Sequence, residues 1–290
     1  MISFALQILD IAIVLIIGAL GLRTRPVDIM IIAQNPGIWG RALLSMFVFM
    51  PAITLLMTWS LPLEPAIRAS LLALSVAPLC PILSKAKTLP ETEGDFMLAL
   101  QIFSAVAAIL AVPIMLALVE QIFHFNTRYP MGKIIWVISK QIGIPLAIGL
   151  VLSRLLGEKR ERIAYWLDRI GNIILIIGMV MILYVVLPNV WGMMANGRLF
   201  SVIAFTGFVL LGSYLFGGPN KGIRDNLIMA GTQRHPGISY VIATVAVPTE
   251  EDAIIAVIVL FVLFGTIATL PYMFNMRKKR KKQSVNEVVK

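Results

Sequence analysis

The chain has few residues of the kinds that carry enzyme chemistry. Among 290 residues it contains one cysteine, Cys80, and two histidines. One cysteine cannot form a disulfide within the chain, and this set cannot supply a Cys/His metal cluster. The sequence also lacks the Gly-x-x-x-x-Gly-Lys-Ser/Thr loop that cradles nucleotide phosphates. We therefore expect that the protein is not an enzyme and holds no organic cofactor.

Charged residues are scarce as well. They make up 14% of the chain, against about 25% in soluble domains. Hydrophobic residues make up 59% and the mean hydropathy is +0.89. A chain of this size cannot bury so much apolar surface in water, which excludes a soluble globular domain and a disordered protein. The excess of 25 Lys and Arg over 15 Asp and Glu fits a membrane protein, and we expect lipids and no nucleic acid as partners.

Nine hydrophobic segments are long enough to cross a bilayer, which takes about 20 helical residues. Five carry no charge, two carry one charge each, and two are interrupted. The segments cover residues 2–21, 42–63, 64–87, 96–119, 134–153, 170–197, 199–220, 224–247 and 253–276. We predict an all-α polytopic membrane protein with nine transmembrane helices.

Proline interrupts the third and the eighth span. The third carries Pro78 and Pro81, and the eighth carries Pro236 followed by Gly237. Because proline removes an amide donor and clashes with the preceding turn, each span should break into two half-helices. Freed backbone at membrane depth is tolerated only where protein buries it or a wet cavity receives it. Two kinked helices with packing roles alone are the alternative.

Similar sequences follow the two breaks. Residues 90–99 and 248–256 each start with proline, continue with an acidic cluster and end in Asp-x-x-x-Ala. The third span runs inwards and the eighth outwards, so the two halves would have opposite topology. We predict one transporter domain at residues 1–276 and a basic tail at residues 277–290. Within the domain, residues 1–119 and 165–276 form two inverted repeats, and residues 132–156 form one unmatched helix. Matched broken spans in inverted halves point to a transporter's midplane site.

Several short motifs occur in the order found in one transporter family. They are Gly18-Ala-Leu-Gly-Leu22, Met50-Pro51, Cys80-Pro81, Gly94-Asp95, Pro145 with Gly149, and Gly231 with Gln233. In these motifs the chain resembles the bile acid:sodium symporter family, in the arrangement that lacks the first of ten helices. The resemblance implies crossed discontinuous helices and secondary transport, in a bacterial inner membrane.

The resemblance also identifies the positions at which the family binds sodium. In this sequence they fall on Ala86, Lys87, Ala99, Phe103, Met229 and Gln233. Met229 stands where the family has a glutamate, and a thioether is a poor ligand for a hard ion. We predict that transport is independent of sodium or coupled to protons, with Lys87 or Lys85 as the surrogate cation. Sodium held by backbone carbonyls and Gln233 is the alternative.

Polar residues at the two breaks are the candidate substrate-binding residues. Arg234 can grip a carboxylate or sulfonate with its guanidinium fork, or it can cap carbonyls freed at the break. His235 can carry a proton or serve as a structural donor. Lys85 and Lys87 can bind an anion or extend to the cytoplasmic interface. Gln233 agrees with the family in residue type and in motif position.

Asp10 and Lys140 stand alone within otherwise apolar spans at equal depth. We predict that they form a buried ion pair, either as a structural lock or as a proton relay. The basic residues near the breaks favour a small organic anion as substrate. We predict a carrier in which spans one, five and six rock against the other six. A receptor that does not transport, or a channel-like subunit, is the alternative function.

Basic residues predict the orientation of the chain. Alternate sides of the nine spans hold 19 and 4 Lys and Arg, and the richer side stays in the cytoplasm. The N-terminus is then outside, and the C-terminus with its basic tail is inside.

A reporter enzyme that is active only in the periplasm, fused after Lys290, should therefore be inactive. A reporter that is active only in the cytoplasm should work at the same position. Strong periplasmic activity would refute both this topology and the inverted repeat.

Overall fold

The regular structure is helical throughout the described part of the chain. The computed structural model describes residues 2–25, 36–80, 91–123, 131–194 and 198–288. The α-helices are α1 (Ile2–Arg23), α3 (Pro36–Leu43), α4 (Met50–Ser60), α5 (Pro65–Val76), α6 (Glu91–Phe123), α7 (Met131–Ile138), α8 (Ile144–Leu155), α9 (Lys159–Met194), α10 (Arg198–Phe216), α11 (Lys221–Thr232), α12 (Pro236–Ala246) and α13 (Glu251–Val288). Two π-helical turns, η1 (Leu44–Phe49) and η4 (Ser139–Gly143), and a 3-10 turn, η5 (Pro248–Glu250), complete the set.

Seven segments are long and apolar enough to cross a membrane. They are Phe4–Arg23, Pro36–Ser60, Ala99–Leu118, Met131–Leu155, Lys159–Val185, Leu199–Phe216 and Pro248–Phe274. These match seven of the nine predicted spans. The remaining two predicted spans contain the short apolar helices α5 and α12, as interrupted spans should. The prediction of an all-α polytopic membrane protein is confirmed.

The second span changes its helical pitch directly before a proline. In η1 the backbone N–H of Met50 donates to the carbonyl oxygen of Ser45, five residues back. The next residue, Pro51, has no N–H, so the carbonyl oxygen of Met46 loses the donor that a continued π-helix would supply. The fifth span repeats this arrangement. The backbone N–H of Ile144 donates to the carbonyl oxygen of Ser139 at the end of η4, and Pro145 follows in α8.

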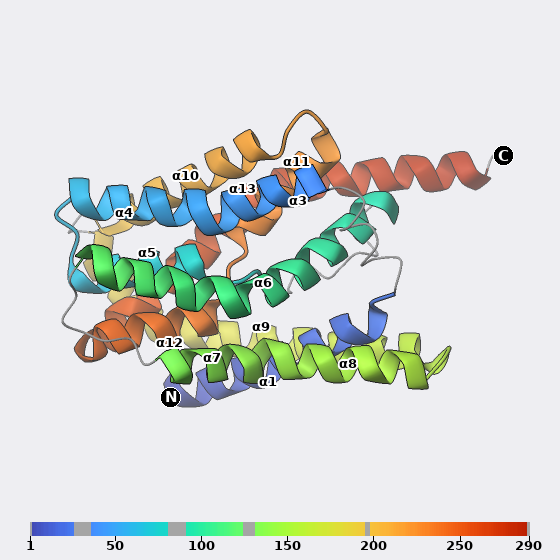
Figure 1. The fold of residues 1–290 in the computed structure, drawn as a ribbon, viewed down its shortest axis with the longest axis horizontal. Coiled ribbons are helices and arrows are strands. Elements are labelled where there is room, and N and C mark those ends of the chain that lie inside the picture. The colour runs from blue at the N-terminus through green and yellow to red at the C-terminus, as the bar shows by residue number, and fades with distance from the viewer. Residues whose placement is uncertain (1, 26–35, 81–90, 124–130, 195–197, 289–290) are drawn as a thin grey trace.

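The helices pack as two groups. The panel consists of α1, α7, η4, α8 and α9, in which α1 packs along both α8 and α9. The other helices form the core bundle, in which α5 packs on α4, α12 and α13. Figure 1 shows the panel along the lower edge, with the N-terminus at one end of the molecule and the C-terminus at the other. The two groups touch through α9 with α13 and α10, through α6 with α7 and η4, and through α12 with α7 and α1.

Glycines bring the backbones of α1 and α8 into contact. A Cβ built on Gly149 would lie 2.5 Å from the carbonyl oxygen of Gly18 and 2.8 Å from Cα of Gly21. Any side chain there forces the helices apart, and small residues are what allow helix backbones to approach within a membrane. Two family motifs therefore meet in the panel, since Gly21 lies in one and Gly149 in the other.

Replacing Gly149 with alanine should destabilise the panel, because overpacking at a close contact costs about 1–3 kcal/mol. The matched control is Gly207→Ala in α10, where an added Cβ meets nothing within 4 Å. Thermal unfolding of the purified variants should place the Gly149→Ala midpoint below both the wild type and the control. Equal midpoints for the two variants would contradict the close packing.

Candidate functional site

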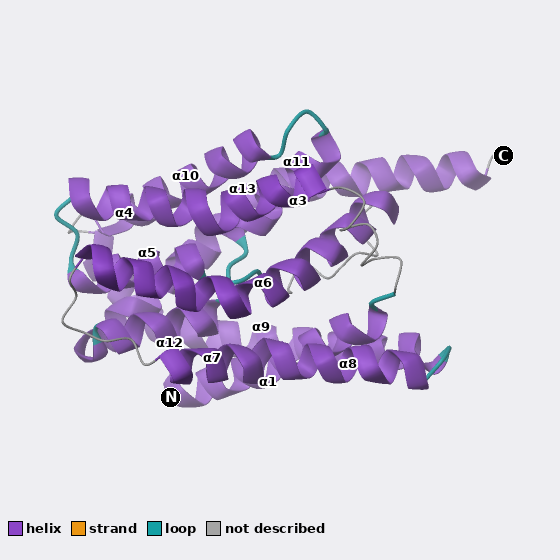
Figure 2. Cartoon of the chain, viewed as in Figure 1, coloured by secondary structure: helices purple, strands orange, loops and turns teal. Residues whose placement is uncertain are grey.

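The two interrupted spans cross and hydrogen-bond to each other. The backbone N–H of Cys80 donates to the carbonyl oxygen of Gln233 at 2.8 Å, and that of His235 donates to Pro78 O at 2.9 Å. Leu79 and Arg234 form an antiparallel β-bridge between these bonds. Figure 2 shows a short non-helical segment inside the helix bundle. The crossing satisfies backbone groups that the breaks remove from the helices.

Proline sets the position of each break. Ala77 precedes Pro78 and is extended, with φ −63° and ψ 146°, because a residue before proline is disfavoured in the helical region. His235 precedes Pro236 and is extended as well. Pro236 then opens α12, since its missing N–H is not needed at the first position of a helix.

Arg234 is a structural residue of the crossing in this conformation. Its side chain is 1% exposed, and its guanidinium donates to Ala77 O at 2.9 Å and to Met46 O at 3.4 Å, and contacts the sulfur of Met50. These contacts correspond to the capping alternative. Two of its nitrogens donate to backbone, and Nε has no partner among the described residues. The predicted contact with a substrate stays a prediction.

Proline explains why two carbonyl oxygens need this arginine. In a continued α-helix Ala77 O would accept from residue 81, and in a continued π-helix Met46 O would accept from residue 51. Both residues are prolines, which have no N–H to donate. The guanidinium of Arg234 supplies both missing donors. The Met50-Pro51 motif thus has a physical role at the crossing.

His235 is also structural in the described arrangement. It is fully buried, and its Nδ1 accepts a hydrogen bond from the backbone N–H of Ile238, which caps the start of α12. Because Nδ1 is the acceptor, the proton of the neutral ring lies on Nε2. Nε2 has no partner among the described residues. The capping bond supports the structural alternative over proton transfer.

Gln233 has the side chain best placed for a ligand. Its backbone is held by the crossing, whereas its amide makes no hydrogen bond within the described residues. The residue is 8% exposed. A buried amide with two donors and an acceptor needs partners. Gln233 can therefore meet either an anion or a cation at the crossing.

Of the other residues predicted from the family's sodium positions, some are apolar and buried or packed, and the rest lie outside the described residues. Met229 in α11 and Ala99 in α6 are buried, and Phe103 packs its ring against Trp39 at 5.4 Å. None of these three side chains offers a hard oxygen ligand. Pro81, Lys85, Ala86 and Lys87 lie outside the described residues.

Three buried polar residues were missed by the sequence reasoning. Gln101 in α6 is 4% exposed, and neither atom of its amide has a partner among the described residues. Asp225 and Asn226 are buried in the first half of α11, and both have interaction partners. An amide inside a charge-free apolar run and an Asp-Asn pair entering an interrupted span were the available signals.

The predicted ion pair between Asp10 and Lys140 is not formed. The side chain of Lys140 is exposed, and the carboxylate of Asp10 instead accepts a hydrogen bond from Nε2 of Gln141 at 2.7 Å. Residues 140 and 141 lie in the π-turn η4 and point in different directions around the helix. The amide, which carries no charge to desolvate, takes the inward position.

Replacing Arg234 with leucine should destabilise the protein strongly. Two buried carbonyl oxygens then lose their donor, at about 1–3 kcal/mol each. Gln233→Ala should change stability little, and Arg234→Lys, which keeps the charge without the fork, should lie between the two. Thermal unfolding of the purified full chain in detergent measures all three. An Arg234→Leu midpoint equal to that of the wild type would contradict the structural role.

Comparison with known proteins supports the resemblance seen in the motifs. No curated protein matches the chain. The sequence model of the Sodium Bile acid symporter family matches residues 10–196, which is more than half of the chain and includes the first interrupted span. Members of this family are membrane transporters. The chain belongs to the Sodium Bile acid symporter family.

Proposed function

We propose that the protein carries a small organic anion across a bacterial inner membrane by alternating access, with its N-terminus outside. The observation that carries this proposal is the crossing of the segments 77–80 and 233–235. Matched interruptions of this kind mark the binding sites of secondary transporters. The free amide of Gln233 lies at this crossing and is the proposed substrate contact.

Charge at the crossing favours an anion over a cation. Arg234 brings a full positive charge that its two carbonyl partners only partly offset. Helix α12 begins at Pro236, so its partly positive end also faces the crossing. Arg234 would then act on the substrate through its field, and Gln233 through contact.

The same arrangement supports transport without sodium. Sodium is a hard cation that prefers oxygen ligands, whereas positions 99, 103 and 229 carry apolar side chains. A fixed guanidinium at the crossing supplies permanently the charge that sodium would bring. We propose Arg234 for this role on the described residues, in addition to Lys87, which the sequence predicts.

A screen of small carboxylates and sulfonates by thermal shift tests the proposal. A bound anion stabilises the folded state and raises the unfolding midpoint, and the shift should be equal in sodium chloride and choline chloride. Gln233→Ala should abolish the shift. The control Gln121→Ala removes an exposed amide from α6 and should preserve it.

Two outcomes would change the proposal. A shift seen in sodium but not in choline would restore the ordinary symporter mechanism. An anion that binds but is not taken up into proteoliposomes would favour the receptor alternative.

A further inference from the structure

Asp10 lies where the panel meets the core bundle. It is half-buried in α1, and on the panel side its Oδ1 accepts the hydrogen bond from Gln141 of η4. A carboxylate within a membrane span is costly and usually functional. Oδ2 of Asp10 has no hydrogen-bond partner among the described residues.

The first turn of α12 lies on the other side of this carboxylate. A Cβ built on Gly237 would lie 3.5 Å from Oδ1 of Asp10 and 3.5 Å from Cε1 of His235. This is ordinary van der Waals distance, so the carboxylate lies beside the N-terminal end of α12, which stabilises a negative charge. Asp10 thus touches the crossing through α12, although it belongs to the panel.

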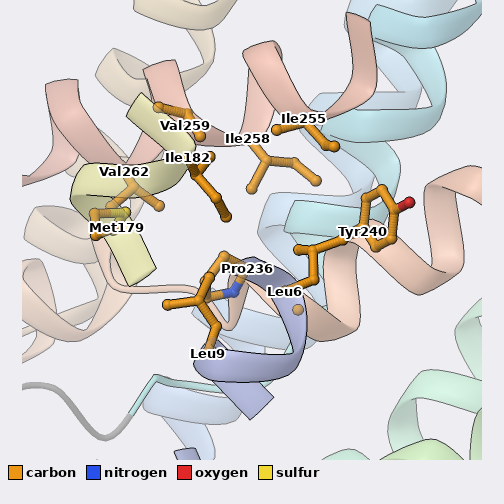
Figure 3. A pocket seen from close by; sticks show the side chains of 11 residues that line it. Leu6, Leu9, Met179, Ile182, Pro236, Tyr240, Ile255, Ile258, Val259 and Val262 are labelled. Carbon is orange, nitrogen blue, oxygen red and sulfur yellow. The ribbon is translucent and has the colours of Figure 1, made fainter. Parts of the chain in front are cut away.

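An apolar pocket extends this boundary. Leu6 and Leu9 of α1 line it together with Pro236 and Tyr240 of α12 and Ile258 of α13. Figure 3 shows these side chains facing one another across the boundary. Its volume of about 20 Å³ corresponds to about one water molecule. The boundary beside Asp10 is therefore lined by apolar side chains.

Few other groups that titrate face Asp10. Lys140 lies in the same turn as Gln141, and its charge acts on the carboxylate although its side chain is exposed. His235 has its Nδ1 occupied by the cap of α12. Tyr240 donates its hydroxyl to Glu251 at 3.2 Å. The part of α9 beside Asp10, between Gly171 and Gly178, contains no residue that titrates, and Asp168 further along α9 pairs with Arg23. Asp10 is therefore the carboxylate of this boundary.

We propose that Asp10 binds the proton that couples ion flow to the movement of the panel against the core bundle. In the present arrangement the donor from Gln141 and the end of α12 offset part of the cost of burying the ionised carboxylate. When α12 moves away, that stabilisation is lost and the carboxylate takes up one proton as a carboxylic acid. It releases the same proton when the contact re-forms. This inference rests on the proposed function, and it names the coupling ion that the apolar sodium positions leave open.

Infrared spectra of the full chain in lipid nanodiscs test whether Asp10 titrates, without any substrate. The acid-minus-neutral difference spectrum of the wild type should contain one carboxylic-acid component that is missing from the spectrum of Asp10→Asn, whereas the components of the other 14 of its 15 Asp and Glu side chains remain. The Asp10 component should remain in Asp168→Asn, which removes a panel carboxylate that pairs with Arg23. Gln141→Leu should move the midpoint to higher pH by about one unit, because the ionised form loses a donor.

Cysteine labelling tests whether this proton moves the panel. With Cys80→Ala as background, Leu6→Cys places a reporter in the boundary pocket. Its reaction rate with a small hydrophilic maleimide should change about tenfold across the titration, and Asp10→Asn should make the rate independent of pH. If Asp10→Asn does not fold, Gln141→Leu provides the test. It must shift the pH midpoint of the labelling rate and the pH midpoint of the infrared band by the same amount.

Either of two results would overturn the inference. One is a carboxylic-acid spectrum that is the same in the wild type and in Asp10→Asn, and the other is a labelling rate that does not change with pH while Asp10 titrates. Since neither measurement uses an anion, failure here leaves the anion-binding result untouched. A negative anion screen with intact pH-dependent labelling would refute the proposed function alone.

Discussion

The buried guanidinium of Arg234 holds the centre of the molecule together. It reaches carbonyl oxygens 157 and 188 residues away in the chain, at Ala77 and Met46. A charge at this depth is unfavourable unless it is paired or fully hydrogen-bonded. The two carbonyls have lost their own donors to proline, and the guanidinium supplies them, although its Nε has no partner among the described residues. These hydrogen bonds join the second, third and eighth spans.

The crossing explains how a member of a sodium symporter family can lack the family's sodium ligands. Backbone carbonyls at helix ends attract cations, and in this chain a side chain of the protein occupies one such end. An ion that already belongs to the fold cannot be exchanged during a transport cycle. On the proposed function, coupling uses another group, for which we propose the carboxylate of Asp10 at the boundary between panel and core bundle.

The panel and the core bundle are built by different kinds of contact. In the panel, Gly21 and Gly149 bring two backbones together without polar bonds. In the core bundle, the crossing is held by backbone hydrogen bonds and by Arg234. At Asp10 the hydrogen bond lies within the panel, to Gln141, and the carboxylate faces α12 of the core bundle across a van der Waals contact. Such a boundary suits rigid-body movement.

The sequence alone was sufficient for the helical class, the spans and the breaks. Hydrophobic length and the loss of an amide at proline are local properties, and neither depends on distant residues. The partners of Arg234, Asp10 and Gln141 could not be found in this way. Residues 140 and 141 are neighbours in the chain, so the sequence does not show which of their side chains faces Asp10. Only the pitch of η4 and its packing on α1 decide this. The tertiary structure therefore decided that Arg234 caps carbonyls and that an amide, not a lysine, meets Asp10. Hydrogen bonds between distant segments depend on orientation, which no sequence pattern encodes.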